Sequence, residues 1–215
     1  AVYEATQHLR EEYREAALTA PAGGDPRAWA AARNWARYGR RQVFLQDANS
    51  LVMAPRDLVA ILLHLKARFP EVTRITSYAR SSTIANLEAG ALAGLRGAGL
   101  SRIHIGMESG SNEVLKMVRK GATQRLHIRA GLKVKAAGME LSEYYMPGLG
   151  GRRWLEANAV ETAAALNEIN PDFIRLRTLA IPTHIPLYRD YAAGRFQKAT
   201  EVETAQELLL FLESL

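Results

Sequence analysis

Polar side chains alternate with apolar ones along several segments that otherwise have the composition of β-strands. One segment carries His104, Gly106 and Glu108 at even positions, with only isoleucine or methionine between them. Arg175 and Arg177 alternate with apolar residues in the same way. Because successive side chains of a strand point to opposite faces, each polar series is expected on one face of a sheet. Imidazole, carboxylate and guanidinium groups gathered there would bind a polar or charged ligand.

A parallel strand that is buried on both faces should be a continuous apolar run, and these segments are not. We therefore expect helices to cover the apolar face and a water-filled cavity to lie against the polar face. The segments at Thr76–Arg80 and at Leu141–Tyr145 are interpreted in the same way. The alternative is a sheet face exposed to solvent without a ligand. The predicted mouth of the cavity consists of Asp47, Asn49, Tyr78, Arg80, His104, Glu108, Glu143, Tyr145, Arg175 and Arg177.

The residues that follow the predicted strands are the natural place for a site, because βα-barrel enzymes carry their chemistry at the carboxyl ends of strands. Segments 106–111 and 146–151 are rich in glycine, which lets backbone approach a ligand closely. Ser109-Gly110-Ser111 also opens a predicted helix, an arrangement that suits an anion. His104 and Glu108 lie on one strand about 13 Å apart, so they cannot share one metal ion.

Strands and helices alternate along the chain. Strands are predicted at 43–45, 73–78, 103–107, 141–146 and 173–179, and each is followed by helical sequence. Helices are predicted at 1–20, 27–38, 58–69, 84–95, 111–118, 123–137, 154–169 and 202–215. This alternation favours parallel βα units. A closed barrel needs eight strands and about 250 residues, so we predict an α/β fold with a partial, open barrel and at least one strand missing upstream.

The 215 residues are expected to form one domain, with a helical lead-in over 1–41, βα repeats over 42–199 and a closing helix over 200–215. The chain lacks cysteine, an apolar run long enough for a membrane span and a signal peptide, so the cytoplasm is the expected compartment. The formal net charge of +6 suits an anionic ligand or nucleic acid, or simply a solvated basic surface.

Segment 102–116 (RIHIGMESGSNEVLK) resembles the radical S-adenosylmethionine (SAM) superfamily. It is similar to the branch that contains the oxygen-independent coproporphyrinogen oxidases, the methylthiotransferases and the Elongator catalytic subunit. Segment 146–151 (MPGLGG) resembles the family's glycine-rich loop, and segment 173–188 (FIRLRTLAIPTHIPLY) resembles its last barrel strand and the loop after it. The resemblance implies a partial six-stranded barrel. It also implies reductive cleavage of SAM at a [4Fe–4S] cluster, giving methionine and a 5′-deoxyadenosyl radical, with electrons from an external donor.

The resemblance also implies roles for particular residues. Glu108 takes the family's position near the methionine part or the ribose of SAM. Lys120, or the adjacent Arg119 in its place, takes that of a basic partner of the SAM carboxylate. Segment 46–50 stands where the family has a Gly-Gly-Glu-like run, so Asp47 or Asn49 would receive the SAM ammonium without glycine's close approach. The remaining expected contacts with SAM or substrate are Tyr78, Arg80, Gly106, Glu143 (or Tyr144 under a one-residue shift), Arg175 and Arg177.

The family's Cys-x-x-x-Cys-x-x-Cys motif is absent from these residues. Three thiolates hold the cluster, so this chain alone is not expected to perform radical chemistry. Either the sequence is a trimmed piece whose cluster ligands lie upstream, or it is a degenerate relative that binds an anionic ligand or RNA without a cluster. An aldolase-like enzyme is a third possibility, but it would want a strand-borne lysine, and the predicted strands contain none. The substrate is not identified, and no membrane is expected as a partner.

Overall fold

The computed structural model describes residues 25–46 and 49–215. Five parallel strands form one open sheet in the order β1-β2-β3-β4-β5, which confirms the predicted α/β class. The strands are β1 (Gln42–Leu45), β2 (Arg74–Ala79), β3 (Leu100–Glu108), β4 (Glu140–Tyr145) and β5 (Phe173–Leu176). Spatial order therefore follows chain order, as it does in a βα barrel that has not closed.

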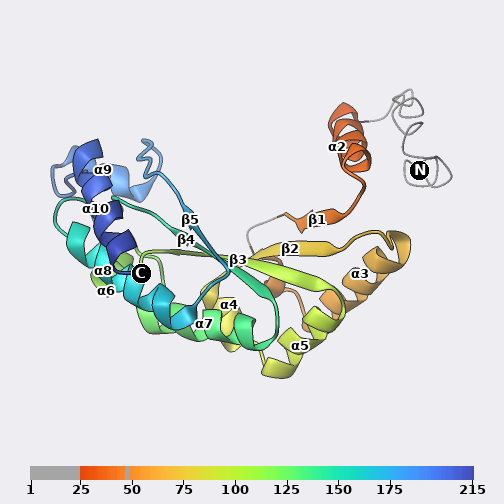
Figure 1. Cartoon of the computed structure of the whole chain (residues 1–215). Helices are drawn as coiled ribbons and strands as arrows, with labels where there is room; N and C mark the ends of the chain where they lie inside the picture. The colour runs from red at the N-terminus through yellow and green to blue at the C-terminus, as the bar shows by residue number, and fades with distance from the viewer. Residues whose placement is uncertain (1–24, 47–48) are drawn as a thin grey trace.

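Helices connect successive strands and precede or follow the sheet. They are α2 (Pro26–Arg37), the 3-10 turn η2 (Ser50–Val52), α3 (Pro55–Arg68), α4 (Ser81–Asn86), α5 (Ala89–Gly97), α6 (Asn112–Met117), α7 (Gln124–Ala136), α8 (Leu155–Ile169), α9 (Pro186–Ala192) and α10 (Glu201–Glu213). Figure 1 shows α3, α5 and α7 on the same side of the curved sheet. The predicted helix at 1–20 lies outside the described residues.

The main hydrophobic core lies between the sheet and these helices. Ile103, Ile105 and Met107 of β3 are fully buried in it, together with leucines of α3 and α5 such as Leu62 and Leu92. The apolar face of β3 was therefore assigned correctly from the alternation of residue types. Burying these side chains is the dominant favourable term in holding helices on the sheet.

Two predictions about local structure are wrong. The helical stripe at 84–95 is split between α4 and α5, because Leu87 and Glu88 adopt extended backbone conformations between them. The face of β4 is also reversed: Leu141 and Tyr145 pack in the core, and the Tyr145 ring lies 4.3 Å from that of Phe211 on α10. Tyr145 therefore does not belong to the cavity mouth, and Tyr144 takes that place.

Candidate binding site at the carboxyl ends of the strands

A cavity of about 820 Å³ lies at the carboxyl ends of β2, β3 and β4. It is lined by strand-end residues and by the connection between α6 and α7, which bring both charges and aromatic rings to one place. Its walls include predicted residues Tyr78, Arg80, His104, Gly106, Glu108, Lys120, Tyr144 and Arg177. The structure thus brings together most of the residues that the sequence singled out, although they are spread over about half of the chain.

Glu108 ends β3 in an unusual backbone conformation, with φ of 68°. The pairing of β3 with β4 shifts register between Ile105 and Glu108, so the strand bends where it enters the cavity. Non-glycine residues rarely adopt positive φ, and residues with such strained backbone conformations are found frequently at functional sites. The Glu108 Oε2 atom is buried and has no hydrogen-bond partner within the described part of the chain. This carboxylate oxygen therefore lacks the hydrogen-bond partner that a buried polar atom usually has.

Lys120 is brought to Glu108 by the way α6 ends. Arg119 is left-handed with φ of 54°, and the Lys120 amide donates to the Leu115 carbonyl at 2.9 Å. This is a Schellman motif, which turns the chain sharply after a helix. It places Lys120 Nζ 3.6 Å from Glu108 Oε1, so cation and anion stand side by side at the cavity wall.

Gly106 keeps the space beside this pair open. A Cβ atom at this position would lie 2.7 Å from Glu108 Oε1 and 3.5 Å from Lys120 Nζ. The first distance is shorter than real Cβ contacts, so any side chain here would displace the carboxylate. A side chain at this position would therefore require the end of the Glu108 side chain to shift away from its place beside Lys120.

Aromatic rings form a row across the inner face of the sheet, on the side away from the main core. The ring centre of Phe44 on β1 lies 4.9 Å from that of Tyr78 on β2. The ring centre of His104 on β3 lies 5.6 Å from that of Tyr78 and 5.9 Å from that of Tyr144 on β4. The Arg177 guanidinium lies over Tyr144 at 4.4 Å from the ring centre. We call Phe44, Tyr78, His104 and Tyr144 the aromatic row.

Three groups of the aromatic row have shifted pKa values. The hydrogen bond with Tyr144, together with burial, raises the pKa of Tyr78. Burial, assisted by Arg175 and Arg102, lowers the pKa of His104 to about 4, so its ring is neutral at neutral pH. Burial opposes the ionisation of Tyr144, but the adjacent Tyr78 hydroxyl and Arg177 outweigh it and lower the Tyr144 pKa. The row is therefore a largely neutral aromatic surface with a cation at one end.

Ser81 and His127 were not singled out from the sequence, yet both line the cavity. Ser81 Oγ lies 2.6 Å from His127 Nδ1, and both residues are buried. Ser81 follows Arg80 directly at the end of β2, so its place after a predicted strand could have indicated a site residue. His127 lies on α7 and carries no strand-end signal; only the packing of α7 against α4 brings it to the cavity.

The remaining predicted site residues lie elsewhere. Asn49 accepts a hydrogen bond from the Arg80 amide at 2.9 Å and donates one to Thr83 Oγ1 at 2.9 Å, so it holds the start of α4. Glu143 is fully buried below the cavity, and burial raises its pKa well above the usual range. Arg175 is exposed beside the aromatic row and does not line the cavity. Asp47 lies outside the described residues.

The glycine-rich loop at 146–151 is held by a buried carboxylate from α10. Glu207 is fully buried and accepts hydrogen bonds from Tyr145 Oη at 2.7 Å, Asn158 Nδ2 at 2.7 Å and the Gly148 amide at 2.8 Å. Asn158 also donates to the Met146 carbonyl at 3.2 Å. This network fixes the loop after β4 against α8 and α10.

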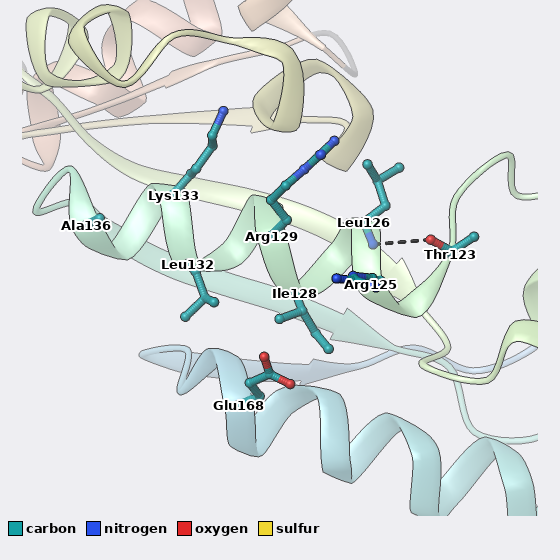
Figure 2. Close-up of a pocket in the computed structure, with 9 residues that line it drawn as sticks. All are labelled: Thr123, Arg125, Leu126, Ile128, Arg129, Leu132, Lys133, Ala136 and Glu168. Atoms are coloured by element: carbon teal, nitrogen blue, oxygen red, sulfur yellow. Dashed lines mark hydrogen bonds between the residues drawn. The ribbon is translucent and has the colours of Figure 1, made fainter.

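A second depression, of about 670 Å³, lies on the outer side of α7 and is shown in Figure 2. Ile128 and Leu132 point toward Glu168 of α8, whereas Arg129 and Lys133 point away from it. Lys133 is already engaged, because it donates to the carbonyls of Ala85 and Leu87. This depression lies on the helical exterior, away from the strand ends.

An open, all-parallel βα sheet with a charged cavity at the strand ends is the architecture of a partial βα barrel. Residues 25–162, more than half of the chain, match the family described as the Radical SAM superfamily, and the chain belongs to that superfamily. This confirms the resemblance seen in the sequence.

Similar proteins are longer than this chain. A "tRNA uridine(34) acetyltransferase" from Methanocaldococcus infernus is 25% identical over 118 residues, which is 54% of this chain and 22% of that protein. The solved archaeal Elp3 of M. infernus, with an N-terminal deletion, has 16% identity and a TM-score of 0.66, covering 87% of this chain and 49% of that one. Coproporphyrinogen III oxidase (HemN) from Escherichia coli has 17% identity and a TM-score of 0.61, covering 80% and 40%. These structural likenesses show the fold.

The chain contains no cysteine, and its described residues hold no group of three or more side chains that would bind a metal ion. Within residues 25–46 and 49–215, no helix is long and apolar enough to cross a membrane.

Proposed function

We propose that this chain is the SAM-binding part of the barrel of a radical SAM enzyme. The observation that carries this proposal is the Glu108–Lys120 pair beside Gly106. The pair presents one cation and one anion 3.6 Å apart, with a buried, unpartnered carboxylate oxygen as seen among the described residues. The methionine end of SAM carries a carboxylate and an ammonium group, which match these two charges.

In this proposal Lys120 binds the SAM carboxylate, and Glu108 accepts from the ammonium group or a ribose hydroxyl. Charge-assisted hydrogen bonds of this kind are about twice as strong as neutral ones. Tyr78, His104 and Tyr144 of the aromatic row line the same cavity and would give the ligand an apolar surface. SAM, when cleaved by one electron, supplies a radical that takes a hydrogen atom from the substrate; the protein supplies position and shielding.

The cluster is a different matter, because the 215 residues include no thiolate to hold it. The residues of this chain therefore do not fit a [4Fe–4S] cluster. Our proposal for the chain is limited to SAM and substrate, and any cluster ligands belong to sequence outside these residues.

We also propose an RNA base as the first substrate class to test. Aromatic faces stack on bases, and arginine pairs with phosphate in a fork geometry. The aromatic row with Arg177 over Tyr144, and the exposed Arg175 beside it, offers both. The names of two archaeal relatives refer to a tRNA uridine, which supports trying tRNA before other anionic substrates.

The test uses the natural protein that contains this chain. It would be reconstituted anaerobically with iron and sulfide, given SAM and dithionite as the electron donor, and assayed for 5′-deoxyadenosine. Formation of 5′-deoxyadenosine that falls about tenfold at subsaturating SAM in Glu108→Gln, but not in the exposed control Glu156→Gln, supports the proposal. If SAM binds but is not cleaved under any reconstitution, the chain is instead a cluster-free barrel that holds an anionic ligand.

A further inference from the structure

His127 lines the cavity and has a hydrogen-bonding atom that is not used within the described part of the chain. The residue is 1% exposed, and its Nδ1 atom lies 2.6 Å from Ser81 Oγ. Its Nε2 atom is buried and has no hydrogen-bond partner in residues 25–46 and 49–215. A buried polar atom without a partner costs about 1–3 kcal/mol, so a native structure keeps one only for a reason.

The contact with Ser81 assigns the proton on the ring. Burial and the nearby Lys120 lower the pKa of His127 to about 4, so the ring is neutral and carries one N–H. Ser81 is also buried, and its hydroxyl proton has no acceptor other than His127 Nδ1 among the described residues. If Ser81 donates to Nδ1, only Nε2 is left without a partner; the opposite tautomer would leave the Ser81 hydroxyl proton unsatisfied as well. His127 Nε2 is therefore a hydrogen-bond donor.

The surroundings of Nε2 select the acceptor. The residues that line the cavity with His127 include Lys120, Arg119 and the serines at the start of α4, and Lys120 is close enough to lower the pKa of His127. These groups favour a negative group of a ligand. Glu108, whose Oε1 atom lies 3.6 Å from Lys120 Nζ beside Gly106, suits the positive group of a ligand.

We propose that His127 donates from Nε2 to the carboxylate of SAM, beside Lys120, and that Ser81 is the positioning residue that fixes the required tautomer. This inference rests on the proposed function, since it names a contact with the same ligand. It assigns a binding residue to α7, a helix that is not considered when site residues are sought only at the carboxyl ends of strands.

Substitutions that mimic one ring nitrogen at a time test the contact. The amide nitrogen of glutamine reaches the position of Nε2, whereas that of asparagine reaches the position of Nδ1. The natural protein and its His127→Gln, His127→Asn, Ser81→Ala and Ser81→Thr variants would be titrated by calorimetry with SAM and with decarboxylated SAM. His64→Asn, an exposed histidine on α3, is the matched control.

We expect His127→Asn to weaken SAM binding about tenfold or more, the effect of losing one hydrogen bond to a charged group. Its affinity for decarboxylated SAM should stay within about threefold of the natural protein. His127→Gln should bind SAM nearly normally. Ser81→Ala should weaken SAM binding about threefold, and Ser81→Thr, which keeps the hydroxyl, should restore it.

Equal losses for both ligands in His127→Asn would overturn the proposal, because they would show a structural role for the ring. Unchanged SAM binding in that variant would overturn it as well. If the natural protein binds neither ligand, the proposed function itself fails. If the natural protein binds SAM but the SAM affinities of the His127 variants differ from those expected, the proposed function stands without this contact. Thermal unfolding of each variant shows that it has folded.

Discussion

The hydroxyl of Tyr145, at the end of β4, donates a 2.7 Å hydrogen bond to the carboxylate of Glu207 on α10. This bond joins the sheet to the last helix inside the core, where neither side chain is exposed to solvent. It also explains why the face of β4 is reversed from expectation. A tyrosine can be buried among apolar residues when its hydroxyl has a partner, and Glu207 is that partner.

Replacing Glu207 with alanine should lower the free energy of unfolding by about 3 kcal/mol, because three buried donors lose their acceptor. Glu207→Gln should cost less, since the amide oxygen still accepts from Tyr145 and Asn158. Urea denaturation measures both, with Glu213→Ala, an exposed change on the same helix, as the control. A loss no larger than that of the control would mean that the network contributes little to stability.

Glu108→Gln should weaken SAM binding by about tenfold while leaving the fold intact, because it removes a charge and keeps the shape. The amide would also place a donor opposite the Lys120 ammonium. Calorimetry with SAM measures the affinity, and circular dichroism checks the fold. The exposed Glu156→Gln on α8 should bind SAM as the natural protein does. Unchanged affinity in Glu108→Gln would remove Glu108 from the site.

Gly106→Ala should reduce SAM affinity about tenfold by pushing the Glu108 carboxylate away from its position. The larger Gly106→Val should fill the cavity mouth and abolish binding. Gly97→Ala is the matched control, because a Cβ atom there meets nothing within 4 Å. Binding by Gly106→Val at normal affinity would contradict the placement of the ligand beside this glycine.

Acid should destabilise the protein in part through His127. Its folded pKa of about 4 lies below the ordinary 6.5, so the unfolded chain binds more protons between these values. The stabilising contribution is complete above pH 6.5 and is lost as the pH falls toward 4. For this residue the loss is about 2 kcal/mol between pH 7 and 5.

Other buried groups titrate as well. His104 acts in the same direction, whereas the raised pKa of Glu143 acts in the opposite one. The measurement is therefore the difference between the natural protein and His127→Gln in chemical denaturation at pH 7 and pH 5, with His64→Gln as the control. Parallel pH dependence in the natural protein and His127→Gln would show that His127 protonates as easily when folded as when unfolded.

The sequence predicts the sheet and much of the site because alternation along a strand reports its two faces directly. It succeeds for β3, where Ile103, Ile105 and Met107 form an apolar series at odd positions. It fails for β4, because the residue type of Glu143 does not show whether its side chain is exposed to solvent or buried. It also misses His127, whose partner Ser81 is 46 residues away and is reached only through helix packing.

β5 is an edge strand of the described sheet. Among the described residues, this strand pairs only with β4 and leaves Phe173 and Leu176 partly exposed. An unpaired, apolar strand edge invites association between copies, and natural proteins blunt such edges with charge. Arg175 and Arg177 flank Leu176 and supply that charge. Neutralising both arginines would therefore lower solubility as well as alter the site, so any lost activity in such a variant has meaning only for protein that remains monomeric.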